Sequence, residues 1–304
     1  MSYSRTAMYV AYLRALADAG ASHVRDFHDP TARALLDARW ARRLARVERA
    51  LRAGKDGLSL AFARVQADMM ALRTEAIDAA VRDAIAAGAT QLVILGAGFD
   101  GRAWRMAELG AVRVLEVDQP ATQAAKRSRI AALPSAIARV TYVPVDFRHD
   151  ALAGALERAG HDAARPTCWI WEGVVMYLAR DAMRSTLADV RRLSAVGSTL
   201  IVNYHTAMPP WLAAWVLRLV REPMRSSWSP EEMALELSAA GFRVREDSGV
   251  AEWAARFATG PVNLRAGHAM RIVVARRVAD ALDRAGFCPT DTATDDAPAA
   301  VTLQ

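Results

Sequence analysis

Residues 91–104, QLVILGAGFDGRAW, contain the features that decide the fold. The apolar run LVIL is short and bounded by turn residues, which is typical of a buried strand in a parallel sheet. Gly96, Gly98 and Gly101 follow at the spacing G-x-G-x-x-G. Such glycines let the backbone approach a nucleotide closely, and the helix that follows offers free N–H groups. We expect a nucleotide site with Asp100 as the helix cap, although a tight turn without a ligand has the same spacing.

The composition limits the classes of protein that remain. A chain of 304 residues that is 53% hydrophobic is long enough for one large folded core. It contains no apolar run of about 18 residues, so we expect no membrane span. The start of the chain lacks the layout of a signal peptide. Two cysteines, Cys168 and Cys288, do not indicate a disulfide framework, and the cytoplasm is the expected compartment.

The net charge of +6 comes almost entirely from arginine, which raises the question of nucleic-acid binding. Arginines recur along one predicted helix between residues 39 and 52. Recognition of nucleic acid would need a clustered basic stripe, but Glu48 interrupts this one and no aromatic residue follows Trp40 within it. A solvated helix face is the simpler interpretation, so we expect no nucleic-acid partner.

The periodicity of apolar residues predicts three regions. Residues 1–90 are predicted to form an N-terminal helical cap of three helices, the second of which begins near Thr31 and ends before Gly54. Residues 91–277 alternate between strand and helix patterns, which predicts an α/β fold with a doubly wound, mostly parallel seven-stranded sheet. Residues 278–304 are predicted to be a tail that is disordered after about residue 288, because that part is rich in Asp, Thr, Ala and Pro.

The seven strands are predicted from apolar runs and turn signals. The last two are expected to form an antiparallel pair at one edge of the sheet. Their predicted ranges are 92–95, 112–117, 140–145, 167–171, 198–203, 242–246 and 270–275.

Consecutive strands end in residues suited to a nucleotide, and ligands of open parallel sheets bind at the carboxyl ends of the strands. Asp118 ends the second strand about 20 residues after the glycines, where an acid can accept both ribose hydroxyls. After the third strand, Asp146 can accept an adenine amino group while Phe147 covers the ring. Glu172 after the fourth strand can hold an ammonium group. Each acid alone fits an ordinary strand end, but their joint occurrence favours a nucleotide site.

Both S-adenosylmethionine and a nicotinamide dinucleotide fit these acids. The long helical region before the first strand and the final strand pair favour a methyltransferase. No Tyr-x-x-x-Lys or comparable hydride-transfer motif is apparent, and Lys126 lies on a predicted surface helix. S-adenosylmethionine is therefore the expected cofactor. A nicotinamide-dependent reductase and a cofactor-binding module without catalysis are the alternatives.

Four stretches in order, LVILGAGFDGRAWRM, LEVDQP, VPVDFR and WEGVVMYL, together resemble the leucine carboxyl methyltransferase family. The resemblance is strongest to the family's bacterial branch of S-adenosylmethionine-dependent methyltransferases, and it covers residues 74–197 well. It implies a class I methyltransferase fold, which is Rossmann-like, and methyl transfer from S-adenosylmethionine. It does not identify a substrate.

The resemblance also implies roles for the residues that match the family's motifs. Gly96 and Gly98 match the turn under the methionine part of the cofactor. Asp118 matches the acid that binds the ribose, and Asp146 with Phe147 matches the pair that binds adenine.

Two charged residues match the family's contacts to the amino acid part of the cofactor. Glu172 matches the acid that faces this part, and Arg73 matches an arginine that pairs with the cofactor carboxylate, which suits a guanidinium fork. A surface position of Arg73 is the alternative in an arginine-rich chain. Arg5 aligns only weakly with a basic residue near the family's N-terminus. Gly101 departs from the pattern, because the bacterial branch usually has threonine there.

The acceptor side of the site is less well defined. Residues 205–229 are predicted to be a lid insertion whose apolar helical stripe packs in the core, covers a hydrophobic acceptor or lies on a membrane surface. Tyr177 is expected to position the acceptor, and His205, just past the fifth strand, is the candidate general base. We expect O-methylation of a carboxylate or hydroxyl of a small molecule. A hydroxyl gains from a general base, whereas a carboxylate needs none, so the carboxylate is favoured. N- and C-methylation are the alternatives, and no metal ion is expected.

Overall fold

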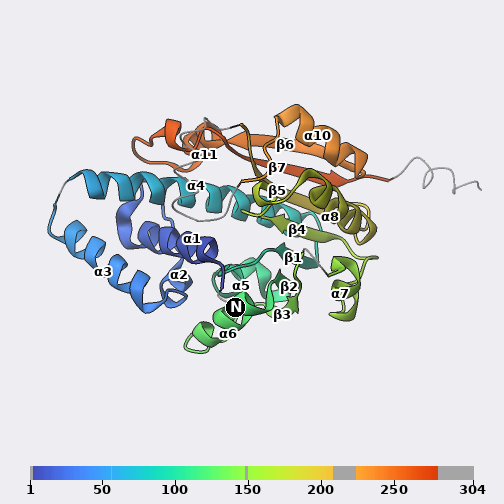
Figure 1. The fold of residues 1–304 in the computed structure, drawn as a ribbon, viewed down its shortest axis with the longest axis horizontal. Coiled ribbons are helices and arrows are strands. Elements are labelled where there is room, and N and C mark those ends of the chain that lie inside the picture. Colours follow the sequence, from blue (N-terminus) through green and yellow to red (C-terminus); the bar gives the residue numbers. More distant parts are fainter. Residues whose placement is uncertain (1–2, 56, 148–149, 208–223, 280–304) are drawn as a thin grey trace, which may run out of the picture.

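The structure of the protein, a computed structural model, describes residues 3–55, 57–147, 150–207 and 224–279. Most of the predicted tail and the middle of the predicted lid, 280–304 and 208–223, lie outside the described residues. The rest forms one seven-stranded sheet covered by helices, and the N-terminal helices lie together at one end of the molecule (Figure 1).

The N-terminal cap is helical, as predicted. It consists of α1 (Arg5–Leu16), a π-helical turn (Ala17–Ala21), α2 (Pro30–Ala34), α3 (Ala38–Arg52) and the long α4 (Leu58–Ala86). The prediction of one helix from near Thr31 to Gly54 was wrong, because the side chain of Asp37 accepts the N–H of Trp40 at 2.9 Å and so caps a new helix. Helix α4 runs from the cap to the sheet (Figure 1), so the two regions share one helix.

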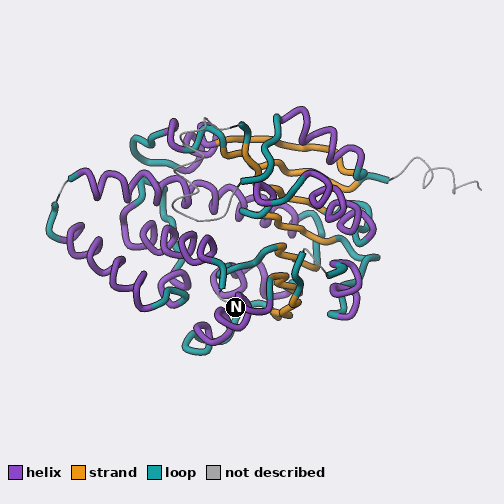
Figure 2. Tube along the Cα trace, in the orientation of Figure 1, coloured by secondary structure: helices purple, strands orange, loops and turns teal. Residues whose placement is uncertain are grey.

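The sheet confirms the predicted topology (Figure 2). Its strands are β1 (Gln91–Leu95), β2 (Arg113–Asp118), β3 (Arg139–Pro144), β4 (Thr167–Trp171), β5 (Thr199–His205), β6 (Phe242–Gly249) and β7 (Met270–Arg277). The strand order is β3-β2-β1-β4-β5-β7-β6. The first five strands are parallel, and β7 is antiparallel to both β5 and β6. The fold is therefore doubly wound and mostly parallel, with the antiparallel pair at one edge.

The two faces of the sheet pack against separate sets of helices. The remaining helices are α5 (Arg102–Arg105), α6 (Pro120–Ile130), α7 (Leu152–Arg158), α8 (Arg180–Arg192), α10 (Pro230–Ala239) and α11 (Val250–Phe257). In β1, Leu92 and Ile94 join a core with α1, α4 and α11, while Val93 and Leu95 join a core with α7, α8 and α10. Burial on both faces explains the unbroken apolar run of this strand. No helix within the described ranges is long and apolar enough to span a bilayer.

Two local boundaries that shape the site differ from the prediction. Strand β5 does not end at Asn203 but continues to His205, because β7 pairs with it along this whole stretch and Nδ2 of Asn203 donates to the carbonyl of Arg271 at 3.0 Å. His205 is thus the last residue of a strand and not a loop residue. The helix after the glycine turn, α5, has only four residues. Asp100 accepts the N–H of Arg102 at 2.7 Å at its start.

Candidate active site

A cavity of about 910 Å³ lies at the carboxyl ends of the central parallel strands. Its walls come from α1, α4, the glycine turn after β1 and the segments that follow β2, β3, β4 and β5. The residues predicted for the site all line this cavity, namely Arg73, Gly96, Gly98, Asp118, Asp146, Phe147, Glu172, Tyr177 and His205. Arg5 lines it as well. The structure thus brings these residues together, while their roles toward a ligand stay predictions.

The glycine turn has both a conformation and a lack of space that require glycine. Gly96 and Gly98 have φ values of +71° and +52°. A Cβ atom at Gly96 would lie 2.3 Å from Cγ2 of Val174, and one at Gly98 would lie 2.9 Å from Cβ of Ala7 in α1. A side chain at either position would therefore displace a neighbouring wall of the cavity.

Asp118, the last residue of β2, fixes the position of the glycine turn. One of its carboxylate oxygens accepts the N–H of Gly98 at 2.5 Å, and the other accepts the N–H of Gln119 at 2.6 Å. Burial raises the pKa of Asp118 above its usual value, although these two N–H groups oppose the shift. Each carboxylate oxygen can accept one more hydrogen bond. The side chain of Thr122 makes one such bond, which a second ribose hydroxyl would replace.

The residues proposed for adenine, Asp146 and Phe147, follow β3 and are both partly buried. The N–H of Asp146 donates to the carboxylate of Asp150 at 2.8 Å, which turns the chain at this point. Phe147 packs against the core on the α7 and α8 side of the sheet. This pair therefore forms one partly apolar edge of the cavity.

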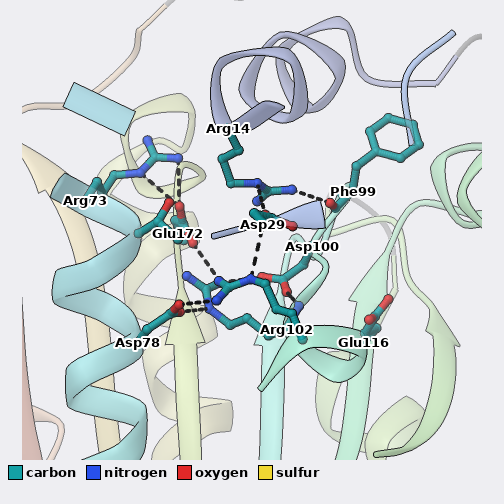
Figure 3. Close-up of polar contacts among 12 residues, drawn as sticks. Arg14, Asp29, Arg73, Asp78, Phe99, Asp100, Arg102, Glu116 and Glu172 are labelled. Atoms are coloured by element: carbon teal, nitrogen blue, oxygen red, sulfur yellow. Dashed lines mark hydrogen bonds and ion pairs between the residues drawn. The ribbon is translucent and has the colours of Figure 1, made fainter. Parts of the chain in front are cut away.

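Arg73 from α4 and Glu172 after β4 form an ion pair on the cavity wall (Figure 3). Oε1 of Glu172 accepts from Nε of Arg73 at 2.9 Å and from Nη2 at 2.7 Å, and the side chains are 7% and 10% exposed. Arg73 is therefore not the surface residue that the sequence also allowed. Burial alone would raise the pKa of Glu172, but the charges of Arg73 and Arg102 outweigh it and hold this pKa below its usual value.

His205 and Tyr177 contribute the groups expected near the acceptor. Burial, assisted by the positive charge of Arg73, lowers the pKa of His205 to about 4, so its imidazole is neutral at pH 7. Its Nδ1 atom is buried and has no hydrogen-bond partner within the described part of the chain. Tyr177 is partly buried at the end of the 3₁₀ turn Val175–Tyr177. Because an imidazole of such low pKa is a weak base, the buried environment of His205 does not favour strong base catalysis.

One wall of the cavity continues into a network of buried charges that the sequence interpretation missed (Figure 3). Four guanidinium groups and four carboxylates, each at most 10% exposed, belong to it: Arg14, Asp29, Arg73, Asp78, Asp100, Arg102, Arg105 and Glu172. One signal was present in the sequence. Asp78 lies on the long helix α4 between Ile77 and Ala79, and a carboxylate in such an apolar stretch needs a buried partner.

The family relationship follows from the whole of this region. A sequence profile of the leucine carboxyl methyltransferase family matches residues 7–191, which include most of α1, the glycine turn and the ends of β2, β3 and β4. The chain belongs to the leucine carboxyl methyltransferase family. The predicted resemblance is confirmed.

Relatives from actinobacteria are similar to this chain. A protein of Mycolicibacterium smegmatis is 43% identical over 153 residues, which cover 49% of each chain. A protein of Frankia alni is 36% identical over 188 residues, which cover 56% of this chain and 65% of the relative. Both carry provisional names as S-adenosyl-L-methionine-dependent methyltransferases. This chain spans about half the length of the curated relatives it matches.

Two solved structures share the fold. A DUF574 family protein from Streptomyces avermitilis superposes with a TM-score of 0.59 over 90% of this chain and 98% of its own, at 16% identity. A protein from Thermobifida fusca, provisionally named a methyltransferase, gives a TM-score of 0.51 over 88% and 94%, at 17% identity. At these identities the likeness concerns the fold alone, and it agrees with the class I methyltransferase fold predicted from the sequence.

The departure from the pattern of the leucine carboxyl methyltransferase family at Gly101 has a structural reason. A Cβ atom at this position would lie 1.8 Å from Oγ1 of Thr31 in α2. The Thr31 hydroxyl donates to Oδ1 of Asp29 at 2.6 Å. The space that a threonine side chain would take is thus filled by a threonine from the cap.

Proposed function

We propose that this protein is an S-adenosylmethionine-dependent methyltransferase that methylates an oxygen of a small molecule, a carboxylate in preference to a hydroxyl. The observation that carries the proposal is the cavity that collects the glycine turn, Asp118, the Arg73–Glu172 pair and His205. Membership of the leucine carboxyl methyltransferase family supports the same cofactor and reaction.

The residues of the cavity fit the parts of the cofactor. The Arg73 guanidinium suits a carboxylate and Glu172 suits an ammonium group, so the pair matches the two charges of an amino acid. Asp118 offers acceptors for ribose hydroxyls, and Asp146 with Phe147 offers an acceptor and an apolar ring for adenine. When bound, S-adenosylmethionine supplies a methyl group on a positively charged sulfur.

The protein's task in this reaction is mainly alignment. Methyl transfer is an in-line displacement, so the acceptor oxygen, methyl carbon and sulfur have to be collinear. Tyr177 lines the cavity after β4 and is proposed to orient the acceptor. His205, with a pKa of about 4, gives a hydroxyl acceptor little help as a base. An acceptor that is already ionised at pH 7, such as a carboxylate, avoids that requirement.

The charge and the apolar lining of the cavity also favour an acidic acceptor. Arg5 and Arg225 line the cavity, both are exposed, and neither forms an ion pair with any of the described residues. Unpaired guanidinium groups attract an anionic ligand. Apolar side chains that line the same cavity are Val10, Leu13, Met70, Val174, Met176 and Leu178. An acid with an apolar body fits this combination.

Titration calorimetry and a methyl-transfer assay test the proposal. We expect S-adenosylhomocysteine to bind and NADH not to bind. In the transfer assay, a panel of apolar carboxylic acids is compared with the alcohols and amines of the same carbon skeleton, and we expect methyl esters from the acids. Binding of NADH alone would contradict the cofactor. Transfer only to amines or to carbon would contradict the acceptor class.

A further inference from the structure

Arg102 is buried behind the cavity and is not one of the residues that line it. It is the first residue of α5, directly after the glycine turn, and its side chain is 1% exposed. Its guanidinium group contacts carboxylates from three separate segments (Figure 3). Nε donates to Oδ1 of Asp78 at 2.6 Å, and Nη1 donates to Oε2 of Glu172 at 3.0 Å and also to Asp100.

Glu172 is held by two arginines, one on each carboxylate oxygen. Arg73 binds Oε1 and faces the cavity, whereas Arg102 binds Oε2 from behind. If a ligand carboxylate binds Arg73, it competes with Glu172 for that guanidinium. Arg102 is then the cation that stays with Glu172.

The charges that face Glu172 come from four segments. They are Arg73 of α4, Arg102 of α5, Asp100 of the glycine turn and Arg14 of α1. Asp78 is not among these charges, so removal of Arg102, with or without Asp78, takes one cation away from Glu172 and leaves Asp100 beside it. In a buried site, loss of a neighbouring cation favours uptake of a proton by a carboxylate.

We propose that Arg102 is a positioning residue for the cofactor: it keeps Glu172 ionised and correctly oriented, so that this carboxylate can bind the ammonium group of S-adenosylmethionine. The inference rests on the proposed function and goes beyond it, because Arg102 itself touches no part of the ligand. Arg102 should therefore contribute to the affinity only for ligands that carry the ammonium group.

The test needs a variant that keeps the buried charges balanced. Arg102→Gln alone surrounds a neutral side chain with carboxylates and endangers folding. The double variant Arg102→Gln/Asp78→Asn removes one cation and one anion. In the unchanged protein Arg105 binds the Asp78 carboxylate at 2.5 Å, and the amide oxygen introduced at position 78 can still accept from Arg105. Arg102→Lys keeps the charge but loses the fork. Thermal unfolding checks that each variant is folded.

Affinity is measured by calorimetry between pH 6 and 8.5 for two ligands. S-adenosylhomocysteine carries the ammonium and carboxylate groups, and 5′-methylthioadenosine carries neither. In the unchanged protein we expect both affinities to be independent of pH. In the double variant, affinity for S-adenosylhomocysteine should fall about tenfold or more from pH 8.5 to pH 6 as Glu172 takes up a proton. Affinity for 5′-methylthioadenosine should stay constant, and Arg102→Lys should bind S-adenosylhomocysteine more weakly without pH dependence.

A pH-independent affinity of the double variant, or equal losses for both ligands, would show that Arg102 is only structural and overturn the inference. Unchanged affinity of Arg102→Lys for S-adenosylhomocysteine would overturn it too, even where the double variant does not fold. If the unchanged protein binds neither ligand, the proposed function itself fails.

Discussion

Arg73 and Arg225 line the same cavity, but one is buried in an ion pair and the other is exposed to solvent. Arg73 is 7% exposed and bound to Glu172 within a network whose charges cancel. Arg225 is exposed and forms no ion pair within the described ranges. The first guanidinium is fixed before a ligand binds, whereas the second has to be ordered by its ligand, which costs side-chain entropy.

The same contrast extends to the neighbours of these two arginines. We call Arg73, Asp118 and Glu172 with the glycine turn, which are proposed to bind the cofactor, the cofactor wall; each of the three side chains is held by hydrogen bonds to other protein groups. Arg5, Tyr177, His205 and Arg225 also line the cavity. They are proposed to face the acceptor, and we call them the acceptor wall. A preorganised wall suits a ligand that never changes, and substitutions in it should cost more than substitutions in the acceptor wall.

Asp118→Ala should have the largest effect, on the cofactor wall. It removes the carboxylate that is proposed to accept two ribose hydroxyls, and it also releases the N–H of Gly98. At about 1.5–3 kcal/mol for each hydrogen bond to a charged group, affinity for S-adenosylhomocysteine should fall at least about tenfold for the loss of one bond and at least about a hundredfold for the loss of both. Calorimetry measures the loss, with Asp181→Ala on the surface of α8 as the matched control. Unchanged affinity in a folded protein would remove Asp118 from the site.

Arg73→Lys should have the next largest effect on cofactor affinity. It separates the contribution of the positive charge from that of the guanidinium fork. Lysine keeps the positive charge beside Glu172 but cannot hold a carboxylate with a fork, so affinity for S-adenosylhomocysteine should fall about tenfold. Affinity for 5′-methylthioadenosine should not change. Equal losses for both ligands would indicate a folding defect instead of a lost carboxylate contact.

Arg225→Ala tests the acceptor wall. Because Arg225 is exposed, loss of its attraction to a carboxylate is worth at most about 1 kcal/mol, which raises KM for the acid acceptor about fivefold. Affinity for S-adenosylhomocysteine should stay the same, and Arg139→Ala at the start of β3 is the control. A loss of cofactor affinity as large as that of Arg73→Lys would erase the distinction between the two walls.

His205→Ala should have the smallest effect. Since burial lowers the pKa of His205 to about 4, its protonation state does not change between pH 6 and pH 9, and the rate of the unchanged protein should be flat over that range. The variant should lose no more than about threefold in kcat, far below the factor of about 10²–10⁴ that a general base contributes. A larger loss, together with a wild-type rate that rises through a pKa near 6.5, would point to a hydroxyl acceptor.

The parts of the fold and site that the sequence predicts are those set by local patterns. Parallel strands bring their carboxyl ends to one edge, so Asp118, Asp146 and Glu172 could be expected together from strand patterns alone. The partners of Arg102 could not be predicted in this way. Its contacts to positions 78 and 172 depend on how α4 and the end of β4 pack beside the glycine turn. The place of His205 in a strand likewise depends on pairing with Met270, far along the chain.

Residues 3–7 form one wall of the cavity. The ring of Tyr3 meets that of Phe99 edge to face at a centroid distance of 5.8 Å, the guanidinium of Arg129 lies over both rings, and Ala7 abuts Gly98. We expect a ligand that binds beneath residues 3–7 to leave no faster than this segment moves aside. Where closure of such a segment traps the spent cofactor, its release and not methyl transfer sets the turnover rate. Two methyltransferases of the proposed kind with equal affinity for their cofactor would thus differ in the residence time of the product.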